Sequence, residues 1–111
     1  MKRLLLIVLP LLLIVGCSKE PINIETTLVE RDGVFYTKDT NKPYTGQVFS
    51  LYDDGKKKEE GTFKDGKKDG LWTWWYENGQ KKTKGTYKDG KQVGKWTWHN
   101  EDGSVKEVKE F

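Results

Sequence analysis

The sequence is poor in cysteine, in apolar residues and in helical periodicity. Its single cysteine excludes a disulfide within the chain. Apolar residues make up 34% of the chain and charged residues 33%, which is lean for a globular core. After residue 17, no segment repeats its apolar residues at the 3.6-residue period of a helix. At 111 residues the chain is therefore expected to form at most one domain, and not a helical one.

The chain also lacks a basic patch. Its formal net charge is +3, but Lys2 and Arg3 supply two of these charges from the very start of the sequence. In the rest of the chain, lysine is interleaved with aspartate and glutamate. Proteins that bind nucleic acid usually concentrate positive charge on one face or stripe, so no nucleic-acid partner is expected.

Residues 1–16 have the pattern of a secretory signal peptide. A basic start is followed by an apolar run from Leu4 to Val15 and then by the small residue Gly16. This run is shorter than the ~20 residues that a membrane-spanning helix needs. The pattern therefore predicts a signal-peptide helix that is removed from an exported protein.

The end of this segment, Ile14–Cys17, resembles a lipobox, the cleavage motif of bacterial lipoproteins. The resemblance implies cleavage before Cys17 and a lipid on its sulfur that anchors the protein to the membrane. Because Ser18 rather than aspartate follows, it also implies an outer-membrane location facing the periplasm. Residues 17–25 are then the lipidated cysteine and a short tether. The alternatives are an ordinary signal peptide with an incidental cysteine, and a short anchor.

A 24-residue repeat organises residues 26–111. Shifting the sequence by 24 positions superimposes most of its glycines and aromatic residues on one another, and a fixed period of this length marks a repeat architecture. The third copy departs from the pattern, because Lys109 stands where the earlier copies have Gly61 and Gly85. The positions expected to carry the repeat structurally are Gly46, Gly55, Gly61, Trp72, Gly79, Gly85, Tyr87, Trp96 and Gly103.

Each copy is expected to be a β-hairpin. Asn78-Gly79 lies between apolar runs, which predicts a two-residue type I′ turn. The register that follows pairs Tyr76 with Lys81, Trp74 with Thr83, Trp72 with Gly85 and, one copy earlier, Val48 with Gly61. Because Gly85 has no side chain, the indole of Trp72 is expected to lie across the gap beside it. Asp89-Gly90 then turns the chain into the next copy.

The predicted fold is all-β, an antiparallel β-meander built from these hairpins. The expected strands are Gln47–Tyr52, Lys57–Lys64, Leu71–Glu77, Lys81–Lys88, Lys95–His99 and Ser104–Phe111, after a degenerate first hairpin of Thr27–Arg31 and Val34–Thr37. Side chains of a strand alternate between its faces. This places Trp72, Trp74 and Tyr87 on an aromatic face and Trp75 on a wetter one.

The motif G-x-W-x-W-x-Y-x-x-G-x-K…G-x-Y-x-x-G-x-x-x-G in Gly70–Gly94 resembles the bacterial variant of the MORN repeat. The resemblance extends over Arg31–Phe111 and implies a hairpin repeat that serves mainly as a scaffold. The chain is also similar to repeat proteins that are identified as antitoxins of toxin–antitoxin systems. That second resemblance implies a partner toxin.

No residue set indicates a catalytic, metal or cofactor site. His99 could act as a general base, but no serine or cysteine nucleophile accompanies it on a neighbouring strand position. The segment Asp53-Asp54-Gly55 is more typical of a turn than of a calcium loop. The carboxylates that could form a glycosidase pair are more typical of a solvated face; they are Glu59, Glu60, Glu101, Asp102 and Glu107.

The five tryptophans form either the core of a thin sheet or an exposed platform for sugars or a partner protein. Trp72 and Trp96 are expected in the core. Trp75, with His99 at the same place in the next copy, is the candidate contact with a partner. Aromatic cages like those of choline-binding repeats are a lesser alternative, because those repeats are shorter. The terminal strand could also add to a partner's sheet.

Together these features predict a non-enzymatic, membrane-anchored repeat lipoprotein without a cofactor. It is expected to bind an unknown protein or cell-wall glycan at the cell envelope. The alternative is an antitoxin-like protein that neutralises a partner toxin.

Overall fold

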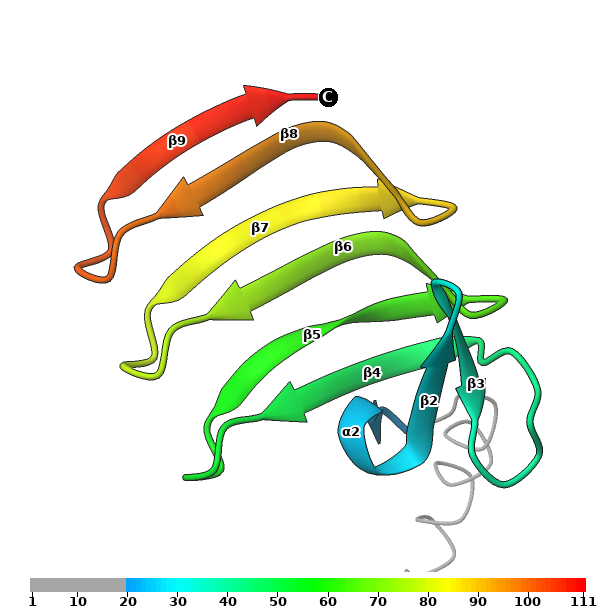
Figure 1. Ribbon diagram of the computed structural model, residues 1–111. Coiled ribbons are helices and arrows are strands. Elements are labelled where there is room, and N and C mark those ends of the chain that lie inside the picture. The colour runs from blue at the N-terminus through cyan, green and yellow to red at the C-terminus, as the bar shows by residue number, and fades with distance from the viewer. Residues whose placement is uncertain (1–19) are drawn as a thin grey trace, which may run out of the picture.

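The computed structural model describes residues 20–111, and most of them form one curved sheet of seven strands (Figure 1). Its main strands are β4 (Gly46–Leu51), β5 (Lys57–Lys64), β6 (Lys67–Trp75), β7 (Lys81–Lys88), β8 (Lys91–His99) and β9 (Val105–Glu110). Each of these strands is the antiparallel neighbour of the next. The predicted all-β meander of hairpins is therefore confirmed.

The N-terminal part of the described chain closes one end of this sheet. Strand β1 (Ile22–Asn23) pairs in parallel with the outer edge of β4, and the single helical turn α2 (Ile24–Thr27) follows it. Ile22 and Ile24 pack against the core. The folded part therefore begins before residue 26, within the segment that the sequence assigns to a tether.

A separate hairpin of β2 (Leu28–Arg31) and β3 (Val34–Thr37) lies across one corner of the sheet (Figure 1). The backbone N–H of Phe35 donates to the carbonyl of Gly66 at 2.8 Å. The Phe35 ring stacks on Phe63 with their centroids 4.6 Å apart. These contacts confirm the degenerate first hairpin and show what holds it to the sheet.

The predicted signal-peptide helix of residues 1–16 and the predicted lipidation site, Cys17, lie outside the described residues. Among residues 20–111, no helix combines the length and the apolar character needed to cross a membrane.

The two ends of the sheet use two kinds of turn. At one end, Asp65-Gly66 and Asp89-Gly90 have positive φ at both residues, 50° and 81° in the first and 50° and 82° in the second. This is the type I′ geometry, which matches the twist of the flanking strands. Asp32-Gly33 has the same geometry in the first hairpin.

The predicted two-residue turn at Asn78-Gly79 is wrong. The N–H of Gly79 donates to the carbonyl of Tyr76, and only Gly79, at φ 90°, has positive φ in this loop. The loop is therefore a type I turn followed by a left-handed glycine. The Asn78 carboxamide stabilises it by accepting from the N–H of Gln80 at 2.9 Å.

The longer loop also changes the register at that end. Lys81 pairs with Trp75 rather than with Tyr76. The other predicted pairs are confirmed: Trp72 with Gly85, Trp74 with Thr83, and Val48 with Gly61.

Two strands begin earlier than predicted. Strand β6 starts at Lys67 and β8 at Lys91, because the chain continues through Gly70 at φ 82° and Gly94 at φ 69° without leaving the sheet. Glycine adopts this left-handed conformation without steric cost, so a strand can bend there.

In the core, indole rings lie over glycines. The strand pair of Trp72 and Gly85 is as predicted, but the prediction that the Trp72 ring covers Gly85 is wrong. A Cβ atom on Gly61 would lie 2.2 Å from the Trp72 ring, and one on Gly85 would lie 2.0 Å from the Trp96 ring. Trp72 thus covers Gly61 of the preceding strand, and Trp96 covers Gly85. The reason is a register shift between Glu60 and Thr62 that leaves Gly61 unpaired with β6.

Hydrogen bonds fix both rings in place. The indole N–H of Trp72 donates to the carbonyl of Thr62 at 3.0 Å, and that of Trp96 donates to the carbonyl of Thr86 at 3.1 Å. Trp72 and Trp96 are 0% and 2% exposed, so their predicted place in the core is confirmed. The other buried hydrophobic residues are Leu28, Tyr44, Val48 and Phe63.

Candidate binding surface

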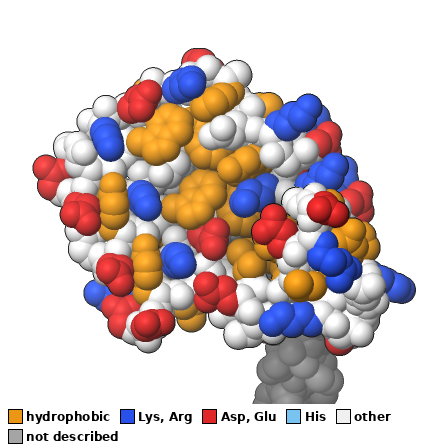
Figure 2. Space-filling model, in the orientation of Figure 1, with side chains coloured by type: hydrophobic (Ala, Val, Ile, Leu, Met, Phe, Trp, Pro, Cys, Tyr) orange, Lys and Arg blue, Asp and Glu red, His pale blue; other side chains and the backbone are white. Residues whose placement is uncertain are grey.

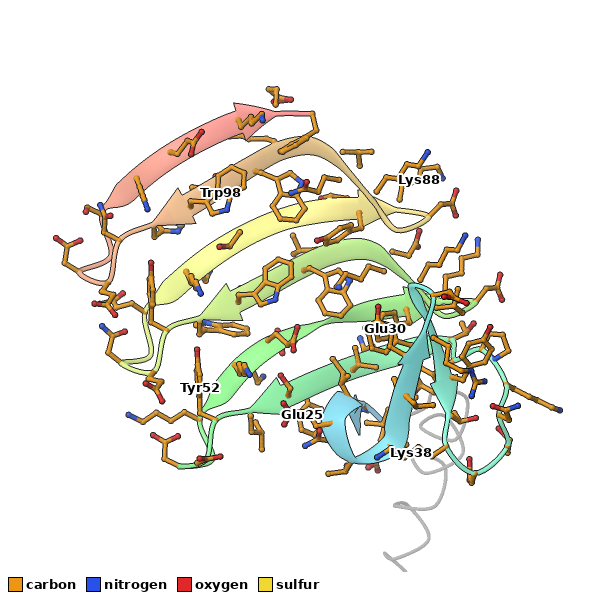
Figure 3. The ribbon with its side chains drawn as sticks, viewed as in Figure 1. Glu25, Glu30, Lys38, Tyr52, Lys88 and Trp98 are labelled. Carbon is orange, nitrogen blue, oxygen red and sulfur yellow. The ribbon has the colours of Figure 1, made fainter. Side chains whose placement is uncertain are left out.

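Four indoles run side by side along one face of the sheet, which we call the indole face (Figure 3). The ring centroids of Trp72 and Trp74 are 5.8 Å apart, those of Trp74 and Trp96 are 5.9 Å apart, and those of Trp96 and Trp98 are 5.9 Å apart. The angles between successive ring planes are only 30°, 32° and 30°. The four rings therefore form a nearly parallel series rather than an edge-to-face cluster.

Two of these rings, Trp72 and Trp96, lie directly over glycines of the sheet. The added Cβ on Gly61 would meet three ring-face atoms of Trp72 at 2.2–2.6 Å, so that ring lies over the glycine with its face rather than with its edge. Trp74 is tilted by 30° from Trp72, and Trp98 by 30° from Trp96. Trp74 and Trp98 are half-buried, unlike Trp72 and Trp96. Part of each of these two rings is therefore exposed, as is part of Trp75 on the opposite face.

Figure 2 shows this arrangement from outside, with broad hydrophobic rings near the middle of the face among single lysines and acidic residues. The surface is therefore aromatic at its centre and of mixed charge around it.

A straight row of paired residues crosses the indole face from β4 to β9. Each member is the register partner of the next; the row is Ser50, Glu59, Trp74, Thr83, Trp98 and Glu107. Thr83, between the two indoles, is small and only 8% exposed. A shallow hollow of about 240 Å³ lies between Trp74 and Trp96, lined by these two rings, Lys82 and Thr83.

Glu59 holds its end of the row in place. One carboxylate oxygen accepts from the hydroxyl of Ser50 at 2.8 Å, and the other accepts from the indole N–H of Trp74 at 3.1 Å. At the other end, no described group accepts from the indole N–H of Trp98, and Glu107 is exposed. Trp74 is therefore held rigidly, whereas Trp98 retains a free donor.

Sequence reasoning missed Lys68, which sits in an aromatic cage on the same face. Its ammonium nitrogen lies 5.2 Å from the centroid of Trp72, 5.5 Å from Tyr87 and 5.9 Å from Phe35. This cation–π arrangement joins the first hairpin to the sheet.

Tyr87, one ring of this cage, has a shifted pKa. Burial raises the pKa of its hydroxyl, and the negative charge of Glu59 raises it further. The only sequence signal for the Lys68 cage is that the other copies have Tyr44 and Gln92 at the position of this lysine.

The predicted contact residues, Trp75 and His99, lie on the opposite face, because neighbours along a strand alternate. Lys57 lies over the Trp75 ring at 5.8 Å. The Nδ1 atom of His99 is buried and has no partner among the described residues. The structure therefore does not bring these two residues into the row on the indole face.

The opposite face also has a larger hollow, about 490 Å³, near the start of the described chain. Pro21, Phe49, Leu51 and Leu71 are among its lining residues. It contains none of the predicted site residues except Gly61.

Two tyrosines tie each hairpin loop to the next copy. The hydroxyl of Tyr52 donates to the carbonyl of Trp75 at 2.6 Å, and that of Tyr76 donates to the carbonyl of His99 at 2.7 Å. The equivalent residue in the last copy, Asn100, instead donates to the hydroxyl of Ser104. These two hydrogen bonds, which we call the tyrosine clamps, fix the position of each copy relative to the next.

Changing either tyrosine to phenylalanine is expected to lower the free energy of unfolding by about 1 kcal/mol, the usual net contribution of one hydrogen bond. Urea unfolding of Tyr52→Phe and Tyr76→Phe measures this. Tyr36→Phe is the matched control, because no described group bonds the Tyr36 hydroxyl. Equal stability of all three variants would show that the clamps contribute nothing.

The aspartates of the loops between strands accept hydrogen bonds from groups of their own loops. Asp54 accepts from the N–H of Lys56, and Asp102 accepts from the N–H and the hydroxyl of Ser104. Those bonds lower the pKa of Asp102. Within residues 20–111, no three histidine, cysteine, aspartate or glutamate side chains are grouped as metal ligands are.

Comparison with known proteins finds a similar family for part of the chain. No curated protein and no solved structure gives a significant match. Residues 44–65 and 68–89, however, each match the family described as MORN repeat variant. The first match spans the hairpin of β4 and β5, and the second spans that of β6 and β7. The segment from β4 to β7 is therefore similar to the MORN repeat variant, and MORN repeats generally serve as binding or scaffold modules.

Proposed function

We propose that this chain is a non-enzymatic binding protein of the cell envelope that captures its partner on the indole face. The observation that carries this proposal is the contrast between two pairs of tryptophans. Trp72 and Trp96 are buried and complete the core, whereas Trp74 and Trp98 keep their outer faces open. Exposed aromatic residues on a rigid frame are typical of recognition surfaces.

The frame supports such a role. Six strands present the row from Ser50 to Glu107 without an intervening loop, and the tyrosine clamps join successive copies. A surface of this kind loses little entropy when it binds, because its side chains are already ordered. The partner is a protein or a cell-wall glycan.

Capture from envelope extracts tests the proposal. Full-length protein in detergent is compared with Trp74→Ala and Trp98→Ala on the indole face and with Trp75→Ala and His99→Ala on the opposite face. We expect the first two changes to abolish capture of an envelope component and the other two to leave it intact. Capture that depends on Trp75 and His99 instead would move the site to the opposite face.

We further propose that the protein is exported and held at Cys17 by a lipid, facing the periplasm from the outer membrane. The support is the resemblance of Ile14–Cys17 to a lipobox and the serine that follows it. Anchoring by more than one acyl chain is durable, since each buried CH₂ contributes ~0.8 kcal/mol.

Metabolic labelling with a palmitate analogue checks the anchor. We expect the wild-type protein to be labelled and to sediment with membranes, and Cys17→Ala to lose both properties. Ser18→Asp is the matched control, because it leaves the cysteine in place and should stay labelled. Labelling of Cys17→Ala at the wild-type level would rule out this anchor.

An antitoxin-like role is the alternative proposal and rests on the resemblance alone. Rescue of growth by this chain from a toxin encoded beside it would support that role over envelope binding.

A further inference from the structure

The accessible indoles lie a regular distance apart. Trp74 in β6 and Trp98 in β8 occupy the same row, with Thr83 of β7 between them. Neighbouring strands are separated by ~4.8 Å, so the two platforms are ~9.6 Å apart along the row. A long ligand that lies across the strands therefore meets an aromatic surface at every second strand.

The ring orientation limits what this ligand can be. At Lys68, three rings surround one cation at 5.2–5.9 Å, which is how the fold holds an ammonium group. Trp74 and Trp98 do not surround a point in this way, because each lies beside its neighbours at a tilt of only 30–32°. They present faces for stacking rather than a cage.

The charges of the row limit the ligand further. Flat aromatic faces also stack nucleic-acid bases, but such sites run along a positively charged groove. Here each indole has a carboxylate as its outer neighbour in the row, Glu59 beside Trp74 and Glu107 beside Trp98, while Lys82 lines the hollow next to Trp74, so the charge along the row is mixed. A row of mixed charge is not the continuous positive groove that a polyanion needs, and its carboxylates can accept hydrogen bonds from neutral hydroxyl or amide groups.

We infer that the indole face binds a neutral β-1,4-linked glycan strand that lies across β5 to β9, an inference that rests on the proposed binding function. In such a strand every second sugar turns the same face to one side, so its repeat of two sugars is comparable with two strand spacings, ~9.6 Å. Alternate sugars stack their C–H faces on Trp74 and Trp98, where the negative ring face attracts the C–H dipoles. The sugar between them lies over Thr83.

The remaining polar groups orient the strand. Glu59 still has lone pairs available beyond its bonds to Ser50 and Trp74, and Glu107 is exposed. The free indole N–H of Trp98 can donate to a sugar oxygen. The hollow of about 240 Å³ over Thr83 leaves room for a substituent such as an N-acetyl group.

Calorimetry with defined sugars tests the inference. The full-length protein in detergent is titrated with a hexasaccharide of β-1,4-linked N-acetylglucosamine and, separately, with maltohexaose, which is α-1,4-linked. We expect the first to bind and the second not to bind, because an α-linked chain curves away from a straight row. Trp74→Ala and Trp98→Ala should each weaken binding about tenfold or more, which corresponds to about 1.4 kcal/mol.

Two further variants separate loss of binding from loss of fold. Trp98→Phe keeps a flat ring and should retain most of the affinity, whereas Trp75→Ala on the opposite face should bind as the wild type does. Absence of hexasaccharide binding at millimolar concentration, or affinity unchanged in Trp98→Ala, would overturn the glycan assignment. If capture from envelope extracts still depends on Trp74 and Trp98 in that case, the partner is a protein and the proposed function stands. If capture is independent of both residues, the proposed function fails as well.

Discussion

Gly85→Ala is expected to lower the free energy of unfolding by about 3 kcal/mol, at the upper end of the usual cost of overpacking. The new methyl group would lie 2.0 Å from Cδ2 and 2.2 Å from Cε2 of Trp96. The ring cannot move aside easily, because its N–H donates to the carbonyl of Thr86 and it makes a T-shaped contact with Tyr87, their centroids 5.1 Å apart. Urea unfolding followed by tryptophan fluorescence measures the loss.

Two comparisons separate this collision from the ordinary cost of losing a glycine. Gly90 has φ 82° but open space, its nearest side-chain atoms being those of Lys67 at 3.8 Å. Gly90→Ala should therefore cost only about 1–2 kcal/mol, the strain of a left-handed alanine. In addition, Gly85→Ala should cost much less in a Trp96→Ala background, because the obstructing ring is gone. Equal costs in both backgrounds would contradict the stacked arrangement.

The second large effect concerns Trp72, whose truncation to alanine should cost about 3–5 kcal/mol. Its ring is fully buried, bonds the carbonyl of Thr62 and contacts Phe63 with centroids 5.3 Å apart. Lys68 loses one ring of its cage, since its ammonium lies 5.2 Å from the Trp72 centroid. The variant therefore weakens the core and also the contact between the first hairpin and the sheet.

Trp98→Ala is the matched control, because the same side chain is removed from the same face. Trp98 is half-buried, and no described group bonds its indole N–H. Its loss should cost about 1–2 kcal/mol, as for a substitution outside the core. Chemical denaturation of the two variants side by side gives the difference. Equal losses would mean that Trp98 is a core residue and not an accessible platform.

The third copy carries a lysine at the position that is glycine in the first two copies. Lys109 pairs with Trp96 as Gly85 pairs with Trp72, so it stands at the place where a further indole would lie. Its ammonium instead lies 4.9 Å from the ring centroid of Phe111. A lysine at this position leaves no bare backbone over which a further ring could lie.

Sequence reasoning predicted local pairing well because strand pairing here is local. The hairpin partners Trp72 and Gly85 lie only 13 residues apart, and alternation alone separates Trp74 from Trp75. It failed at Asn78-Gly79, where a dipeptide typical of type I′ turns forms a longer loop. The Asn78 side chain, which bonds the backbone of Gln80, favours that loop, and a turn motif alone does not reveal this competition.

The 24-residue period, the strand alternation and the pairing of aromatic residues with glycines follow from the order of residues alone, since each depends on neighbours within one hairpin. Folding decided which glycine each indole covers, because a bulge opposite Gly61 turns Trp72 back across β5. It also decided how far each ring is covered, so that Trp72 and Trp96 are buried whereas Trp74 and Trp98 are half-buried. That outcome depends on contacts between copies, where rings from separate strands either bury one another or stay open to solvent.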